Sequence, residues 1–163
     1  MNLTDARSLA LELMGQHLTM VDAWEGFFVD EGWSFEWMQQ KRTLGDCSHG
    51  KRRIRLSTAC TECNDEATVR NTILHEIAHA LVGPGHGHDF VWKAQARALG
   101  VRPESCSRSC VAPLGKWVAV CPRCSYEHNA YRKPHVSKLC AKDACQYAAA
   151  DTRRLTYTER RKS

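Results

Sequence analysis

Two histidines four residues apart, with a glutamate directly after the first, constrain this sequence more than any other feature. They stand in the stretch His75-Glu76-Ile77-Ala78-His79. In an α-helix, residues i and i+4 point to the same side, so both imidazoles can reach one metal ion. Zinc binds histidine nitrogen at about 2.0–2.1 Å, and a glutamate placed in this way accepts a proton instead of binding the metal. The pattern therefore predicts a helix with His75 and His79 as zinc ligands and Glu76 as general base.

The flanking sequence predicts an α+β domain, in which a helix and a small sheet pack on that central helix. Apolar residues recur at helical spacing in some segments and at a period of two in others. Capping residues near Asn64 and a Gly-Pro-Gly stretch from Gly83 bound the central helix. We expect further helices over 4–18 and 89–99, strands over 33–37 and 52–57, and a turn-rich connection over 44–50.

A zinc site needs at least one further ligand, and two histidines follow the central helix in Gly85-His86-Gly87-His88-Asp89-Phe90. A glycine-rich reversal there would turn the chain back so that His86 faces the metal. His88 is then expected to be exposed or to support the site. Asp89 either caps the next helix or orients a ligand. The next acidic residue is Glu104, so three histidines with one position open to water are the simplest ligand set.

Four of the nine cysteines form two pairs with the spacing of a zinc ribbon. Cys121 and Cys124 flank two residues, and fifteen residues later Cys140 and Cys145 flank four. Four thiolates at such spacing close a tetrahedral structural site, although free thiols are the alternative. A signal peptide and a membrane-spanning run are not expected, so the chain is assigned to the cytoplasm, where paired cysteines bind metal more often than they form disulfides.

Four more cysteines form a second, ambiguous set, and one stands apart. The set is Cys60, Cys63, Cys106 and Cys110. These residues could converge on a further zinc ion, but nothing in the sequence brings the two pairs together, so unconnected thiols are favoured. Cys47 is expected to be a small buried residue.

The positive charge lies in the last third of the chain. Residues 116–163 carry 11 Lys and Arg against 4 Asp and Glu, a balance of +7, whereas the first 115 residues balance at −2. Basic side chains interleaved with tyrosines suit phosphate contacts and stacking on single-stranded bases. The expected nucleic-acid contacts are Arg132, Lys133, Lys138 and Lys142. The alternative is that the tyrosines pack a small core beneath a solvated basic face.

Taken in order, these pieces resemble the SprT-like metalloprotease family. The resemblance rests on the central His75–His79 motif, on Leu44-Gly45-Asp46-Cys47, on Ile54-Arg55-Leu56-Ser57 and on the distal cysteines, and it covers roughly residues 4–150. The family's pattern His-Gly-x-Glu/Asp-aromatic matches His86-Gly87-His88-Asp89-Phe90. Its first histidine is the third zinc ligand, which implies His86 as ligand and leaves His88 at the variable position.

The resemblance implies a zinc-dependent metallopeptidase with one catalytic and one structural zinc ion. The expected layout is a protease domain over 1–115, a zinc ribbon over 116–150 and a basic tail over 151–163. Substrates would be proteins on DNA, including DNA–protein crosslinks, which places the chain in DNA repair and in association with single-stranded or crosslinked DNA. The alternatives are a zinc-ribbon nucleic-acid-binding protein with an inactive or structural central site, and a hydrolase of a non-peptide bond. Peptide preference and oligomeric state stay open.

Overall fold

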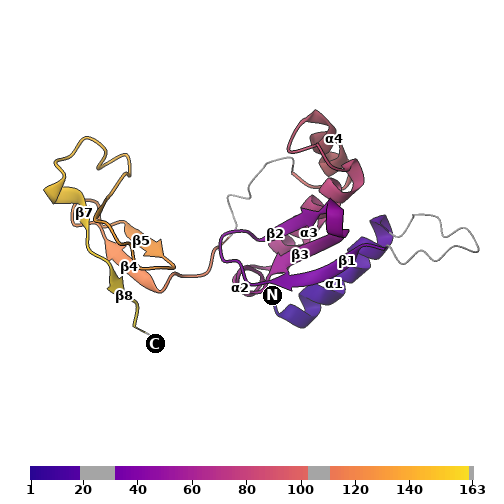
Figure 1. The fold of residues 1–163 in the computed structure, drawn as a ribbon, viewed down its shortest axis with the longest axis horizontal. Coiled ribbons are helices and arrows are strands. Elements are labelled where there is room, and N and C mark those ends of the chain that lie inside the picture. Colours follow the sequence, from indigo (N-terminus) through magenta and orange to yellow (C-terminus); the bar gives the residue numbers. More distant parts are fainter. Residues whose placement is uncertain (19–31, 103–110, 162–163) are drawn as a thin grey trace, which may run out of the picture. The chain divides into compact units, whose positions relative to one another are not determined.

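The computed structural model describes residues 1–18, 32–102 and 111–161 and divides into two compact units (Figure 1). The first unit is Met1–Pro113 and the second is Leu114–Ser163. In the sequence, the boundary between the units lies two residues before the one predicted after residue 115. Across the described ranges, no helix is both long enough and apolar enough to cross a membrane.

The first unit is an α+β domain, as predicted. Its helices are α1 (Leu3–His17), α2 (Thr58–Glu62), α3 (Glu66–Val82) and α4 (Phe90–Ala98). Its strands are β1 (Ser34–Met38), β2 (Gly45–Ser48) and β3 (Arg53–Ser57), with a 3₁₀ turn, η1 (His49–Lys51), between β2 and β3. The turn-rich connection expected over 44–50 is only partly present, because the 4 residues Gly45–Ser48 form strand β2.

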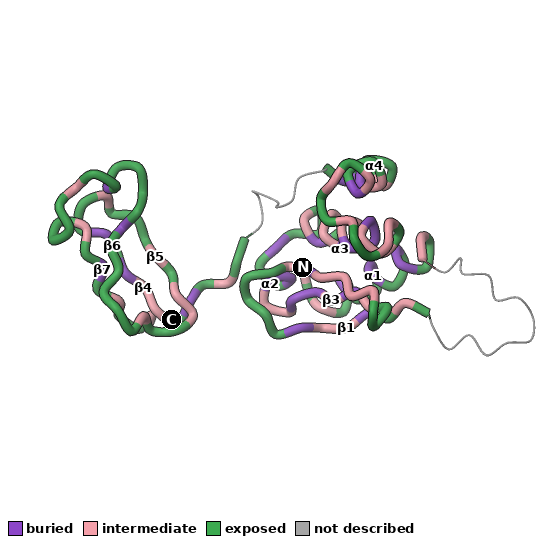
Figure 2. Tube along the Cα trace, turned by 45° about the horizontal axis from the view of Figure 1, so that its top comes forward, coloured by how far each residue is buried: buried purple, intermediate pink, exposed green. Residues whose placement is uncertain are grey.

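The three strands form one sheet in the order β1-β3-β2. β1 runs parallel to β3, and β2 runs antiparallel to it as an edge strand, with Cys47 opposite Ile54. Helices α1 and α3 contact this sheet and each other, and the residues between these layers are buried (Figure 2). The core includes Leu9, Leu13, Phe35, Ile54, Leu56, Ile73 and Ile77. On its other face the sheet is charged: Arg55 Nε donates to Asp46 Oδ1 at 2.8 Å, and Arg53 pairs with Glu36.

Capping residues fix where the two helices nearest the histidines begin. Asp65 Oδ1 accepts the backbone N–H of Thr68 at 2.8 Å at the start of α3, which ends at Gly83 in a positive-φ conformation. Asp89 Oδ1 accepts the N–H groups of Val91 and Trp92 at the start of α4. These bonds satisfy amides that a helix leaves without partners in its first turn.

The second unit is a small module with short strands. They are β4 (Trp117–Val120), β5 (Glu127–Ala130), β6 (Lys138–Leu139), β7 (Arg154–Leu155) and β8 (Thr158–Glu159), and a 3₁₀ turn, η2 (Asp151–Arg153), precedes β7. β4 lies between β5 and β8, and β6 pairs with β7. The described part of the predicted tail over 151–163 supplies two of these paired strands, β7 and β8. Few apolar residues are buried here; the cluster consists of Ala119, Leu155 and three cysteines.

Candidate metal centres

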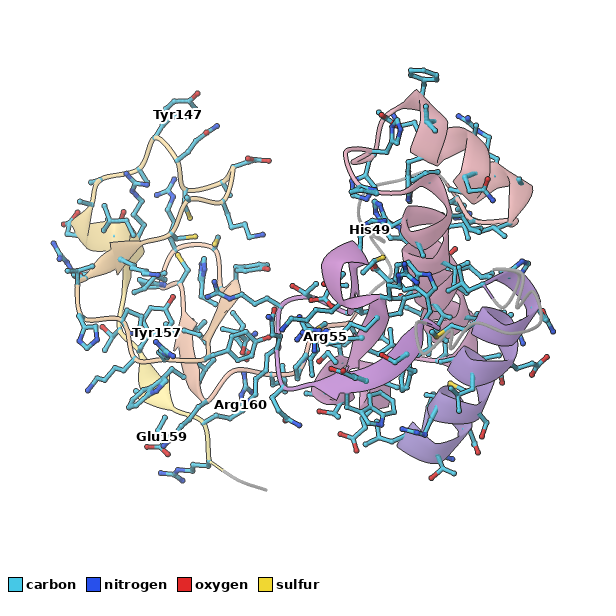
Figure 3. The ribbon with its side chains drawn as sticks, turned by 45° about the vertical axis from the view of Figure 1, so that its right-hand side comes forward. His49, Arg55, Tyr147, Tyr157, Glu159 and Arg160 are labelled. Atoms are coloured by element: carbon cyan, nitrogen blue, oxygen red, sulfur yellow. The ribbon has the colours of Figure 1, made fainter. Side chains whose placement is uncertain are left out.

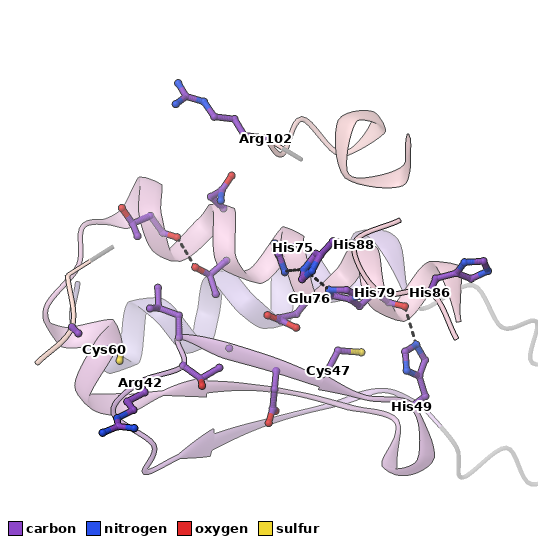
Figure 4. Close-up of a pocket in the computed structure, with 18 of the residues that line it drawn as sticks. Arg42, Cys47, His49, Cys60, His75, Glu76, His79, His86, His88 and Arg102 are labelled. Atoms are coloured by element: carbon purple, nitrogen blue, oxygen red, sulfur yellow. Dashed lines mark hydrogen bonds between the residues drawn. The ribbon is translucent and has the colours of Figure 1, made fainter. Parts of the chain in front are cut away.

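Three imidazole nitrogens converge at the exposed side of α3 (Figure 4). His75 and His79 come from α3, and His88 comes from the loop that follows it. His88 Nε2 lies 3.1 Å from His75 Nε2 and 3.3 Å from His79 Nε2. A tetrahedral zinc ion with bonds of about 2.0–2.1 Å holds neighbouring ligand atoms about 3.3–3.4 Å apart. The two distances from His88 are close to this value, and all three nitrogens lie within 4.8 Å of one another, so they can surround one zinc ion.

The third histidine of this cluster is His88, whereas the sequence predicted His86. His86 Nδ1 lies 2.8 Å from Asp89 Oδ2, and its ring points away from the other histidines (Figure 4). Positive φ angles at Gly83 and Gly85 shape the reversal that brings His88 over α3. Of the two roles considered for Asp89, the structure shows the cap of α4; its other oxygen holds His86, which lies outside the histidine cluster.

Trp92 forms the back wall of the histidine cluster, and sequence reasoning missed it. Its indole is fully buried, with ring centroids 4.6 Å from His75, 5.1 Å from His79 and 4.4 Å from His88. Packing against all three rings restricts their rotation. The sequence feature that could have indicated Trp92 is its position as a large aromatic residue one turn after Asp89, on a helix that must pack against α3.

The environment keeps the two α3 histidines neutral. Burial lowers the pKa of His75 to about 4, with further lowering by His79 and His88. Burial likewise lowers the pKa of His79 to about 4, with a smaller contribution from His88, while a hydrogen bond with the backbone of His86 acts in the opposite direction. Neutral imidazoles present a free lone pair, which a metal ligand needs.

Glu76 lies beneath the histidines with its side chain buried. Burial raises the pKa of this carboxyl to about 8, and the charge of Asp46 adds to the shift. The residue packs on strand β2: a Cβ built on Gly45 would lie 3.0 Å from Glu76 Cγ and 3.1 Å from Glu76 Oε1. A charged form of Glu76 therefore needs a cation nearby.

Strand β2 and helix α3 border a cavity of about 1380 Å³ that contains the histidines and Glu76. The loop carrying His86 and His88 completes its wall. This volume exceeds the roughly 300–1,000 Å³ typical of small-molecule pockets and suits a polymer segment. Cys47 also lines it, half-buried, and burial followed by the charges of Glu76 and Asp46 raises the pKa of its thiol to about 12. Cys47 is thus a protonated thiol at neutral pH and a poor metal ligand.

The second unit brings together the four cysteines predicted for a ribbon. Sγ of Cys121 lies 3.7 Å from Sγ of Cys145, and Sγ of Cys124 lies 3.7 Å from Sγ of Cys140. Zinc–thiolate bonds of about 2.3 Å in a tetrahedron place sulfur atoms about 3.8 Å apart. Burial opposes ionisation of Cys121, but backbone hydrogen bonds from Cys124 and Arg123 lower its pKa to about 7. The cluster fits a closed structural zinc site.

Comparison with known proteins identifies the first unit. Residues 17–110 match the SprT-like family, which is more than half of the chain. The chain belongs to the SprT-like family. Among solved structures, the metallopeptidase zymogen jannalysin of Methanocaldococcus jannaschii is similar at 19% identity and a TM-score of 0.44, covering 58% of this chain and 80% of that one. No curated protein matches.

This SprT-like protein is a metallopeptidase whose His75, His79 and His88 fit the family's helix motif plus a third histidine ligand.

Two of the four expected nucleic-acid contacts lie beside aromatic rings of the second unit. The ammonium groups of two lysines lie over aromatic rings: Lys133 is 5.1 Å from the ring centre of Trp117, and Lys142 is 3.8 Å from that of Tyr126. Both lysines are exposed, as are Arg132 and Lys138.

The remaining cysteines of the SprT-like chain are only partly described. Cys60 is buried and Cys63 is exposed. Cys106 and Cys110 lie outside the described residues. Unconnected thiols stay the prediction for these four residues, and zinc counting tests it against a third zinc site.

Proposed function

We propose that this SprT-like protein is a zinc-dependent peptidase that cleaves proteins bound to DNA, including proteins crosslinked to it. The observation that carries the zinc-peptidase part is the convergence of three imidazoles, with ring nitrogens within 4.8 Å of one another, above a buried carboxyl group. His75, His79 and His88 would hold the ion. When bound there, zinc supplies Lewis acidity toward a substrate carbonyl and toward water.

Glu76 performs the proton transfers in this proposal. In the metal-free protein its carboxyl holds a proton up to about pH 8. A dication held by the adjacent histidines lowers that pKa, because an opposite charge favours the ionised form. The carboxylate then accepts a proton from the attacking water and delivers it to the leaving amine. Trp92 keeps the imidazoles in place during this step.

The DNA part of the proposal is supported by the charge of the second unit. Residues 116–163 carry the excess of +7, and exposed Arg132 and Lys138 accompany Tyr147, which is 93% exposed and projects from the unit (Figure 3). Exposed aromatic and basic side chains suit contacts with bases and phosphates. A cytoplasmic, nucleic-acid-associated location goes with this proposal. Recruitment through the ribbon would bring the cavity of the first unit to proteins on DNA.

The decisive experiment compares the wild type with Glu76→Gln on a DNA-bound protein, with and without single-stranded DNA. Glutamine keeps the size of the side chain but cannot accept the proton. We expect cleavage by the wild type, stimulated by DNA, and a loss of about 10²-fold or more with Glu76→Gln. Cleavage that survives the substitution would refute the role of Glu76. DNA binding without wild-type cleavage would favour a nucleic-acid-binding protein with an inactive central site.

Stimulation by DNA is tested separately with Arg132→Ala and Lys138→Ala. Both side chains are exposed and belong to the second unit, so peptide cleavage without DNA should not change. We expect weaker DNA binding and a shallower dependence of affinity on salt concentration, because each lost phosphate contact reduces counterion release. Unchanged binding by the double variant would remove these residues from the proposed surface.

A further inference from the structure

A third histidine-bearing segment reaches α3 from the sheet side. His49 is the first residue of η1, directly after β2, and its ring points up to the helix (Figure 4). His49 Nε2 lies 2.8 Å from the backbone oxygen of His79. His79 is a member of the histidine cluster, so this contact joins the sheet to the metal centre at its backbone.

The chemistry of the acceptor fixes the state of His49. A carbonyl oxygen only accepts, so Nε2 of His49 must carry the hydrogen and donate it. That nitrogen is then committed and cannot bind a metal ion, in agreement with the absence of His49 from the described metal-ligand clusters. The accepting carbonyl belongs to the last turn of α3, where the partial negative charge of the helix dipole favours a donor.

His49 is itself held from two sides. The N–H of Arg52 donates to the backbone oxygen of His49 at 3.1 Å, which closes the 3₁₀ turn, and the ring of Trp33 meets the His49 ring edge-on with centroids 5.8 Å apart. The preceding Ser48 is paired with Arg53 in the sheet. The side chain is therefore a short connection between a fixed strand and the helix end.

We propose that His49 is a positioning residue for the histidine metal site: its hydrogen bond fixes the last turn of α3 on β2 and thereby sets the distance between His79 and His88. This inference rests on the proposed function, because it assumes that the three histidines hold zinc. Strand β2 then supports the helix motif at two points. Gly45 lies under Glu76, and His49, the first residue after β2, holds His79 in the last turn of α3.

The test compares His49→Phe, which removes the donor but keeps a ring, with His49→Gln, whose amide N–H can reach the same carbonyl. Lys51→Ala is the matched control, since Lys51 is exposed in the same turn. Zinc release to a chromophoric chelator is followed in the full chain. Zinc is expected to leave the two sites in two kinetic phases. The phase that is missing in a His75→Ala variant is assigned to the histidine site, and the other phase to the cysteine site.

For His49→Phe we expect about tenfold weaker zinc retention in that phase and a lower kcat with little change in KM, because supporting groups around a metal site typically contribute 10–100-fold. His49→Gln should recover both values to within about threefold, and Lys51→Ala should match the wild type. Retention and kcat unchanged in His49→Phe would overturn the proposal, as would a His49→Gln variant as impaired as His49→Phe. A wild type without peptidase activity would refute the proposed function, whereas the zinc measurement would still test His49.

Discussion

Replacing Gly45 with alanine should displace the side chain of Glu76, the proposed general base, without changing its carboxyl group. The added Cβ would lie 3.0 Å from both Glu76 Cγ and Thr72 Cγ2. Carbon atoms in good contact are about 3.5–4.0 Å apart, so the neighbours must retreat by roughly 0.5–1 Å. Glu76 is only 7% exposed and lies in the middle of α3, so it cannot swing into solvent. The methyl group must therefore push the helix from the sheet or displace the carboxyl group.

Overpacking of this kind costs about 1–3 kcal/mol, and for a unit of this size each kcal/mol lowers Tm by about 4–8 °C. A displacement of the catalytic carboxyl by about 1 Å reduces the rate by up to about 10²-fold. Thermal unfolding followed by circular dichroism and kcat on a peptide substrate measure the two effects.

Gly50→Ala is the control, because a Cβ at Gly50 meets nothing within 4 Å and the residue belongs to the same segment. Two of the three nearest atoms at Gly45 belong to Glu76, so the Tm penalty of Gly45→Ala should shrink in a Glu76→Ala background, leaving the contact with Thr72. If Gly45→Ala had the Tm and kcat of Gly50→Ala, the packing argument would be wrong.

Three further predictions concern the metal sites. His88→Ala should lose the zinc of the first unit and its peptidase activity, whereas His86→Ala should retain that zinc; metal content per chain distinguishes them, and the reverse result would restore His86 as the ligand. In the metal-free protein, stability should fall as pH rises from about 6.5 to about 8, because folded Glu76 keeps a proton that the unfolded chain releases, whereas below about 6.5 the lowered pKa values of His75 and His79 act in the opposite direction; Glu76→Gln should lack this decline in urea titrations at several pH values. Cys121→Ser should collapse the dispersed amide resonances of the second unit and leave thermal unfolding of the first unchanged, since metal rather than core holds that module.

The parts of the site that sequence predicts are the local ones. His75, Glu76 and His79 lie within two turns of one helix, so their relative placement follows from helical geometry alone. The capping residue Asp65 and the helix end at Gly83 are equally local signals. The paired ribbon cysteines could be assigned for the same reason, because a four-thiolate site tolerates few arrangements at that spacing.

The choice between His86 and His88 was not accessible in this way. It depends on the backbone angles at Gly83 and Gly85 and on the bond from His86 to Asp89, which only the folded loop determines. Strand β2 was missed because Gly-Asp-Cys-Ser lacks the apolar alternation of a strand. Its edge position and its contact with α3 decide its conformation, and its support of Glu76 and His79 depends on pairing that sequence does not display.

The strand that closes the second unit lies against the strand that opens it. Arg160 N–H donates to the oxygen of Lys116 at 2.7 Å, and the Arg160 side chain reaches Glu127 Oε1 at 2.6 Å and Asn129 Oδ1 at 2.7 Å. The points where the backbone enters and leaves the module are thus neighbours. Because its two ends are close together, such a segment can be inserted into a surface loop of another protein, or circularly permuted, without distorting either backbone. We therefore expect the second unit to fold when it is inserted into another protein.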